Sequence, residues 1–377
     1  MLEAVADVDR VVLLGDVLEM RHGPLREAMA AARPFFEDLG QALAGRELVI
    51  VAGNHDHGLI EPWLDARGAE AEPPPLDVEQ LLDPEEVSPA MARIAEWASP
   101  ASVRIAYPGI WIRPDVYAMH GHYLDCHLTI PTLERLSVGA MSRLLGRPAA
   151  GFDRVGDYEA VGTPVFAWRD AVARESLGVP QSLDTVSAWN VLRKTGDSDV
   201  SANGARPAGG QSARLRRLRW MSRGRAKSRL RRRVLVGLFP LVVAALNRAG
   251  IGPLKTDIST GELRRAALNA MGEVAARLGL GDAYVVFGHT HRAGPLPGDD
   301  EQEWRGRLGA RLVNAGSWTY AAIFLTTNSG ESPYWPGGCV LVEDEGPPVL
   351  KRLLVDRPHA ELAACLSPDA AVASARR

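Results

Sequence analysis

The sequence predicts an α/β fold with one core, built from both ends of the chain, and a large, mostly helical cap inserted between them. Two observations lead to this prediction. Short apolar runs typical of buried strands occur near the N-terminus and return near the C-terminus. Between them, the residues from about 126 to 194 contain no strong strand-like run and look helical and irregular.

The N-terminal part of the core is predicted from alternating strand and helix patterns. Strands are expected at Arg10–Leu14 and at 47–52, because both runs are apolar and stop at a glycine. The stretch 24–45 between them is rich in Ala, Leu and Glu and predicts a helix, with an interruption at Pro34. Three further short strands, separated by turn residues, are predicted at 102–106, 109–113 and 116–120.

The C-terminal part repeats this pattern after an amphipathic helix that is predicted over 261–278. Strands are predicted at 283–287, 311–313, 338–342 and 349–355. We therefore assign the core to residues 1–125 and 280–358, the cap to 126–279 and an Ala-rich tail to 359–377. Within the cap, residues 195–213 are small, polar and rich in glycine, which is the composition of a flexible linker.

Composition argues against a disulfide-stabilised protein and against a protein that spans a membrane. The 377 residues include 43 Lys and Arg against 46 Asp and Glu, so the overall charge is close to neutral. The three cysteines lie far apart, which argues against a disulfide framework and suits a reducing compartment. No signal peptide is visible, and the longest apolar run, 234–246, has 13 residues, whereas a bilayer needs about 20. We expect a cytoplasmic protein that does not span a membrane.

Four short clusters of polar residues each follow a predicted strand. They are Gly15–Glu19 (GDVLE), Gly53–His57 (GNHDH), His120–His122 (HGH) and Gly288–His291 (GHTH). Ligand sites form at strand ends in open α/β sheets, and glycine beside a ligand leaves room for an ion or a phosphate. We therefore expect the four clusters to form one site.

The residue types of these clusters predict a metal site. Carboxylate, amide and imidazole groups together suit divalent ions such as Mn, Fe, Zn or Co. His289 and His291 are two residues apart in an extended segment, so both side chains can face one centre. Taken alone, a Gly-Asp or an Asn-His pair is more often a turn. Four such clusters, each at the end of an apolar run, favour metal binding instead.

In their order, GDVLE, GNHDH, HGH and GHTH resemble the motif series of the calcineurin-like metallophosphoesterases. The resemblance covers roughly residues 9–125 and 280–355 and leaves the cap unexplained. It implies a two-sheet core flanked by helices, two divalent metal ions, and a hydrolase acting on a phosphate ester or anhydride. Its metal ligands would be Asp16, Asn54, His120, His289 and His291. Asp16 would bridge the two ions, and His291 would bind the first ion.

The same resemblance implies roles in catalysis. A hydroxide that bridges the two metals would attack the phosphorus in line with the leaving group. His55, oriented by Asp56, would contact the phosphate and protonate the leaving oxygen. For Glu19 and His57 a supporting and a direct role both stay open, and His122 is expected to support the site rather than bind metal.

One motif of the family has no counterpart. The family begins with Asp-x-His at the end of its first strand. Here the only aspartates upstream of Asp16 are Asp7 and Asp9, and no histidine accompanies them. Both precede the predicted strand that Asp16 follows, so they would lie at the opposite end of the sheet from the site. The first metal would keep Asp16 and His291 alone, fewer ligands than a catalytic site uses. Three explanations stay open. A native N-terminal strand is missing, which we favour; or a cap residue replaces the pair; or the protein is degenerate, with one metal or no activity.

The segment 214–246 is the most unusual part of the cap. In its first part, Arg214–Arg233, 11 of 20 residues are Lys or Arg, and an apolar run follows directly. One interpretation is contact with the inner membrane face and a lipid-linked or nucleotide-linked phosphorylated substrate. Nucleic-acid binding is less favoured, because aromatic residues are few. A solvated basic helix before a buried one is the third interpretation. The alternative function is a non-catalytic protein that binds a membrane surface or nucleic acid through this cap.

Overall fold

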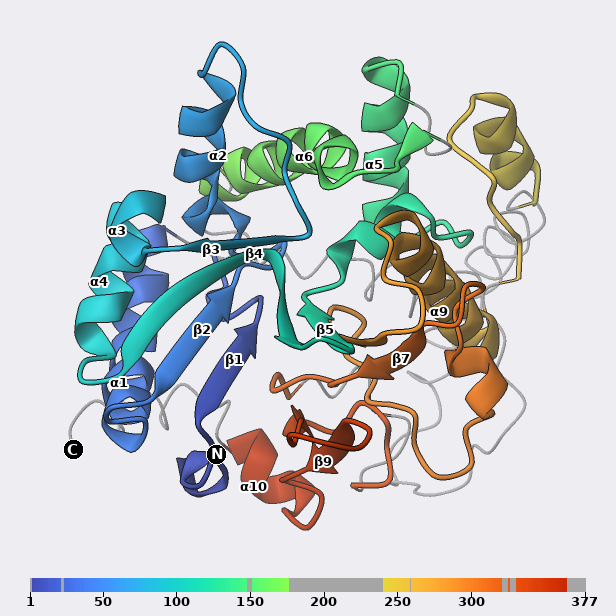
Figure 1. The fold of residues 1–377 in the computed structure, drawn as a ribbon. Coiled ribbons are helices and arrows are strands. Elements are labelled where there is room, and N and C mark those ends of the chain that lie inside the picture. Colours follow the sequence, from blue (N-terminus) through green and yellow to red (C-terminus); the bar gives the residue numbers. More distant parts are fainter. Residues whose placement is uncertain are drawn as a thin grey trace, which may run out of the picture.

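The computed structural model describes residues 2–21, 24–147, 151–175, 240–257, 259–320, 325 and 330–364. These residues form an α/β protein with a mixed, mostly parallel sheet of seven strands, flanked by helices, and a second sheet of two strands (Figure 1). The strands of the large sheet are β1 (Arg10–Leu14), β2 (Glu47–Val51), β3 (Glu79–Leu82), β4 (Ser102–Arg113), β5 (Val116–Met119), β6 (Tyr284–Phe287) and β7 (Arg311–Asn314). Strands β8 (Gly338–Leu341) and β9 (Val349–Arg352) form the small antiparallel sheet.

The predicted α/β class is confirmed, and each predicted strand has a counterpart with ends shifted by no more than a few residues. Two details of the strands were wrong. The predicted strands 102–106 and 109–113 are one continuous strand, β4. Strand β3 was not predicted, because its sequence Glu-Gln-Leu-Leu lacks an apolar run and pairs only through its position beside β4.

The carboxyl ends of strands β2 and β5 both lie beside the middle of β4. Strand β2 runs parallel to the first half of β4, and its last residue, Val51, pairs with Ala106. Strand β5 runs antiparallel to the second half, and its last residue, Met119, pairs with Gly109. Strand β1 lies parallel to β2, and strand β6 lies parallel to β5. The carboxyl ends of all four strands therefore point toward one region.

Helices α1 (Leu25–Ala42) and α4 (Pro89–Trp97) cover the β1–β2–β4 half of the sheet. Their apolar residues, among them Phe36 and Ile94, share one buried cluster with Leu48 and Ile50 of β2. Helix α1 continues through Pro34, where the sequence predicted an interruption. Short elements complete this half: η1 (Leu2–Val5), η2 (His57–Leu59), α2 (Glu61–Gly68) and α3 (Pro84–Val87).

Helices that belong to the predicted cap pack on the β5–β6–β7 half. They are α5 (Leu133–Leu144), α6 (Val155–Glu175) and α9 (Thr260–Arg277), together with the short η3 (His122–Cys126). Residues of these helices, such as Tyr158 and Met271, share one buried cluster with Tyr117 and Phe287 of the sheet. In the described part of 126–279 all regular elements are helical. The remaining elements are η5 (Glu301–Trp304) and α10 (His359–Ala364).

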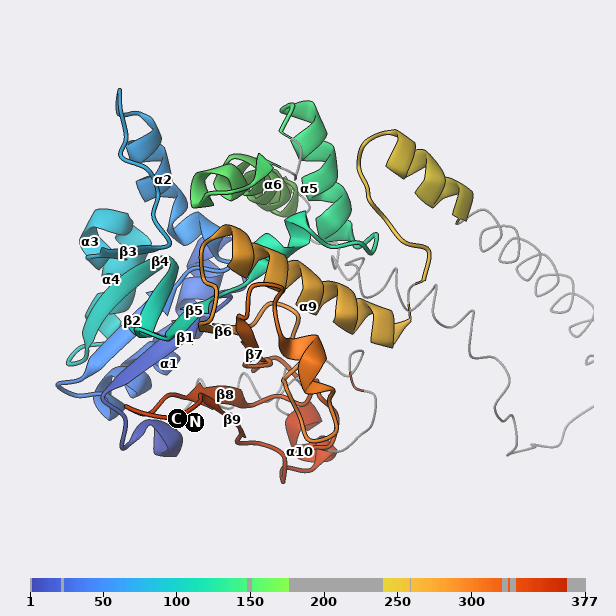
Figure 2. The ribbon, with the colours of Figure 1, turned by 45° about the vertical axis from the view of Figure 1, so that its right-hand side comes forward.

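The predicted linker 195–213 and most of the basic segment 214–246 lie outside the described residues. Residues 240–248, which include the end of that segment, are helical and lie at the periphery, beyond α5 and α9 (Figure 2). Among the described helices, none is long and apolar enough to cross a bilayer.

Candidate metal centre

Three of the predicted metal ligands have an unusual backbone conformation. Asp16, His289 and His291 have φ angles of 55°, 61° and 61°, in the left-handed region that residues with a side chain rarely adopt. The only other residue with a side chain and such an angle in the described part of the chain is Asp282. Backbone strain of this kind persists only where the surrounding structure enforces it, and it is concentrated at functional sites.

Glycines next to the ligands provide the space that the site needs. A Cβ atom on Gly15 would lie 2.4 Å from Nδ1 of His120, and one on Gly53 would lie 2.2 Å from Oδ1 of Asp16. Neither position can carry a side chain without displacing a ligand. The glycines of the first two sequence clusters therefore allow the strand ends to approach each other closely.

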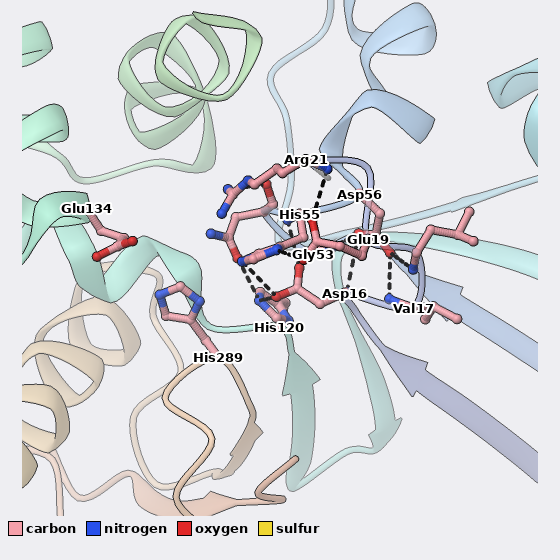
Figure 3. Close-up of polar contacts among 12 residues, drawn as sticks. Asp16, Val17, Glu19, Arg21, Gly53, His55, Asp56, His120, Glu134 and His289 are labelled. Atoms are coloured by element: carbon pink, nitrogen blue, oxygen red, sulfur yellow. Dashed lines mark hydrogen bonds and ion pairs between the residues drawn. The ribbon is translucent and has the colours of Figure 1, made fainter. Parts of the chain in front are cut away.

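Side chains from three strand ends converge on one point. Asp16 follows β1, His120 follows β5 and His289 follows β6, and one potential ligand atom of each lies within 4.8 Å of the others. Oδ2 of Asp16 is 3.2 Å from Nε2 of His120. Figure 3 shows these three side chains directed into a common space. This group could hold a metal ion.

Asn54, which follows β2, contributes a fourth potential ligand atom. Its amide oxygen lies 3.1 Å from Nε2 of His120, and the same position is 3.3 Å from Oδ2 of Asp16 and 3.2 Å from Nδ1 of His289. An amide oxygen among a carboxylate and two imidazole nitrogens is unfavourable unless a cation lies among them or the amide rotates. The four side chains therefore fit a divalent ion, which prefers this mixture of oxygen and nitrogen donors.

Hydrogen bonds on the far side of each imidazole select the nitrogen that faces the centre. Nδ1 of His120 lies 2.9 Å from the carbonyl oxygen of Leu14, so this nitrogen carries the proton and Nε2 can bind metal. Nε2 of His289 lies 3.0 Å from Oδ2 of Asp125, so Nδ1 is the potential ligand. Such outer contacts fix the tautomer and the orientation of a metal-binding imidazole.

Electrostatics favour a charged Asp16 and a neutral His291. Burial alone would raise the pKa of Asp16, but its contacts with His120 and His55 hold that pKa well below 3.8. Burial lowers the pKa of His291 from 6.5 to about 4. His291 is close enough to Asp16 and His55 for their charges to affect it, but among the described residues it is not part of the converging group.

His55 lies at the edge of this centre and is oriented by Glu19. Its Nδ1 is 2.6 Å from Oε2 of Glu19, while its Nε2 is 4.0 Å from Oδ2 of Asp16. The sequence predicted Asp56 as the orienting partner, whereas the structure gives this contact to Glu19. The reason is that the GDVLE segment folds back over the GNHDH segment, a tertiary contact that sequence order does not reveal.

Asp56 instead holds the two loops together. Its buried carboxylate accepts hydrogen bonds from four backbone N–H groups, those of Asp16, Val17, Leu18 and Gly53. Both loops contribute a predicted metal ligand. Asp56 therefore fixes the distance between Asp16 and Asn54.

His57 points away from the centre, into a buried polar cluster. Its Nε2 lies 3.3 Å from both Glu159 of α6 and the hydroxyl of Tyr107. Tyr107, Tyr123 and Thr163 also donate hydrogen bonds to Glu159. Burial would raise the pKa of Glu159, but His57, His122 and the hydrogen bond from Tyr123 hold it at about 2. A charged carboxylate thus connects α6 to the GNHDH loop.

His122 is buried behind the ligands. Its ring centroid is 5.5 Å from that of His120, and neither of its ring nitrogens has a hydrogen-bond partner among the described residues. Burial and the nearby His120 lower its pKa well below 6.5. It lies outside the converging group of the described residues, so its expected supporting role stays a prediction.

Comparison with protein-family models, with curated proteins and with solved structures gives no match. The site is therefore assigned from its own geometry and from the order of its motifs.

Three residues of the site were missed by sequence reasoning. Asp125, Arg21 and Glu159 contact His289, Asn54 and His57, respectively. Arg21 lies two residues beyond Glu19, so proximity to a motif was a usable signal. Asp125 lies three residues beyond His122 and had the same signal, whereas Glu159 had none, because it lies far from all four motifs in the sequence.

Proposed function

We propose that this chain is a metal-dependent hydrolase that cleaves a phosphate ester or anhydride bond. The observation that carries the proposal is the convergence of Asp16, Asn54, His120 and His289 on one point. The motif order GDVLE, GNHDH, HGH and GHTH, with its resemblance to calcineurin-like metallophosphoesterases, supports the choice of reaction. In the proposal, Asp16 and His291 would hold the first ion, and Asp16, Asn54, His120 and His289 would hold the second.

The residues named as ligands would bind Mn or a similar divalent ion. Metal ions in such a site neutralise the phosphoryl oxygens and lower the pKa of a bound water. Asp16, charged because of its low pKa, supplies the negative charge that the cations need. His291, neutral because of its burial, has a lone pair available near neutral pH.

His55 is the proposed general acid. Glu19 accepts a hydrogen bond from its Nδ1, so the proton given to the leaving oxygen would come from Nε2, the nitrogen nearer to Asp16. Asp56 keeps the loops that carry Asp16 and His55 in register. General acid catalysis by a positioned histidine contributes about 10²- to 10⁴-fold to a rate.

Hydrolysis of 4-nitrophenyl phosphate and of its bis(4-nitrophenyl) diester, with and without Mn, tests this function. We expect Mn-dependent turnover of at least one ester, and its loss in Asn54→Ala and in His289→Ala. His359→Ala, which changes a histidine in α10 outside the four motifs, is the control and should keep the activity. Unchanged turnover in either site variant would contradict the proposal. Metal binding without turnover would favour the non-catalytic alternative.

A further inference from the structure

The two most exposed large apolar side chains in the described part of the chain both belong to the predicted cap. Leu144, the last residue of α5, is 80% exposed, and Leu241 is 65% exposed. Leu241 lies in the helix of residues 240–248, which we call the peripheral helix, and Val242 beside it is 52% exposed. Leu145, which follows α5, is 44% exposed. Both elements therefore present aliphatic side chains at the surface.

Hydrogen bonds fix the peripheral helix beside α5. The side chain of Asn247, in its last turn, donates to the carbonyl oxygen of Leu254 at 3.0 Å and accepts from the backbone N–H of Leu254 at 2.7 Å. Farther along, Nη2 of Arg135 in α5 donates to the carbonyl oxygen of Gly252 at 3.1 Å. Figures 1 and 2 both show the helix next to α5 and away from the large sheet. Its exposed side chains are therefore held at a defined place.

The apolar surface of the peripheral helix extends over most of its length. Residues 241–246 are all apolar, yet only Val243 among them is buried, and Leu246 is half-buried. A helix at the surface of a globular protein normally turns its apolar residues toward the core and its polar residues outward. Here apolar residues face outward, which is typical of a surface that binds an apolar partner or lies in a membrane interface.

The charge around these residues is positive. Arg143 and Arg248 are exposed, and Nη1 of Arg143 lies 2.7 Å from the position that a Cβ atom on Gly250 would take. The end of α5 therefore adjoins the end of the peripheral helix. In the sequence, residues 214–256 include no acidic residue, and 11 of the 20 residues in 214–233 are Lys or Arg. Aliphatic residues next to basic ones form the combination that binds an anionic lipid surface.

We propose that the peripheral helix and the end of α5 form a surface that binds an anionic lipid membrane. The aliphatic side chains enter the boundary between the headgroups and the acyl chains, and the arginines contact the lipid phosphates. The residues of this surface are Leu144, Leu145, Leu241 and Val242, with Arg143 and Arg248. The proposal is independent of the proposed function, because it involves no residue of the metal centre.

Two other occupants fit this surface less well. A second copy of the chain would form a two-fold interface, in which the same patch meets itself. Such an interface would bring the exposed arginines of both copies together, and like charges repel each other. Nucleic acid is bound by polar contacts and by aromatic stacking, for which exposed aliphatic residues are unsuited. A lipid surface engages both the aliphatic and the basic residues.

Co-flotation of the full chain with lipid vesicles tests the proposal. We expect the wild type to float with vesicles that contain phosphatidylglycerol and to float less with vesicles of phosphatidylcholine alone. Salt should reduce the flotation, because it screens the headgroup charge. Leu144→Glu and Leu241→Glu each remove apolar burial and add a negative charge, so each should lower the partition coefficient by about tenfold or more.

A matched control is Leu308→Glu. Leu308 lies between η5 and β7, outside the predicted cap, and is 57% exposed. This variant makes the same chemical change at a similarly exposed leucine and should float like the wild type. All three variants should keep the wild-type circular dichroism spectrum, because substitutions at exposed positions change stability little.

Absence of wild-type flotation with anionic vesicles would overturn the proposal, and so would equal flotation of the wild type and both cap variants, or an equal loss in the control. A wild-type dimer that becomes monomeric in Leu241→Glu, without vesicle binding, would assign the surface to a second copy. Binding of an RNA oligonucleotide without flotation would assign it to nucleic acid. Hydrolysis of soluble 4-nitrophenyl phosphate, measured in the same variants, should stay at the wild-type rate, so failure of this proposal and failure of the proposed function are distinguishable.

Discussion

Oδ2 of Asp125 lies 3.0 Å from Nε2 of His289, so a carboxylate of η3 determines which nitrogen of a β6-end histidine faces the centre. Both side chains come from loops on the β5–β6 half of the sheet, and Asp125 is buried. The contact leaves Nδ1 of His289 directed at the same point as Asp16 and Asn54. Asp125 is therefore a positioning residue for a ligand rather than a ligand itself.

Replacement of Asp125 should weaken metal binding. In Asp125→Ala the His289 ring loses its outer partner, and we expect Mn affinity to fall by about 10- to 100-fold. Asp125→Asn keeps an oxygen that accepts the hydrogen bond and should lose less. Calorimetric titration with Mn measures both. A folded Asp125→Ala protein with wild-type Mn affinity would contradict the assigned role.

Replacement of Glu19 should affect the protonation of the leaving group. In Glu19→Gln the charged partner of His55 is lost, so rates should fall most for esters whose leaving group needs a proton. We expect a loss of about 10²-fold or more for an alkyl phosphate and a smaller loss for 4-nitrophenyl phosphate. Equal losses for both esters would show that Glu19 does not act through His55.

Replacement of Asp56 should destabilise the fold. Asp56→Ala removes the acceptor of four backbone N–H groups, and unsatisfied buried donors are costly, so we expect the free energy of unfolding to fall by about 3 kcal/mol or more. Asp38→Ala, at an exposed position of α1, should change it by about 0.5 kcal/mol or less. Urea denaturation measures the stability of both variants. Similar stability of the two would contradict the role of Asp56 in holding the two loops together.

Glu159 should make stability depend on pH in the acid range. Its pKa in the folded protein is about 2, lowered from 4.5, so the unfolded chain takes up the proton more readily between these values. The stabilisation is therefore complete above about pH 4.5 and is lost as the pH falls toward 2. In Glu159→Gln the decline of stability between pH 5 and pH 3, measured by urea denaturation, should be shallower. An unchanged decline would contradict the assignment.

Much of the sheet and the composition of the centre could be predicted from sequence, for local reasons. The apolar runs at β1 and β2 are short and are followed by glycine, so the position of each strand and of the turn after it could be predicted from neighbouring residues alone. Metal-binding residue types directly after these runs indicated one site. The way in which the strand ends meet could not be predicted, because it depends on the pairing of Val51 and Met119 with neighbouring positions in the middle of β4.

The contacts behind the ligands were beyond sequence reasoning. The orientation of His55 by Glu19 requires the loops after β1 and β2 to overlap, and Asp56 is adjacent to His55 in sequence but is fully engaged with backbone groups. Glu159 comes from α6, more than a hundred residues from His57, so only tertiary packing brings them together. Such partners have no periodicity or spacing that a single sequence displays.

The most direct test of the central claim is the metal content of the purified protein, measured by inductively coupled plasma mass spectrometry after incubation with Mn and removal of unbound ions. We predict stoichiometric Mn in the wild type and in the His359→Ala control, and its loss in Asp16→Ala and His289→Ala. Wild-type protein without bound metal, or equal metal content in the site variants and the control, would contradict the assignment of a metal centre at these strand ends.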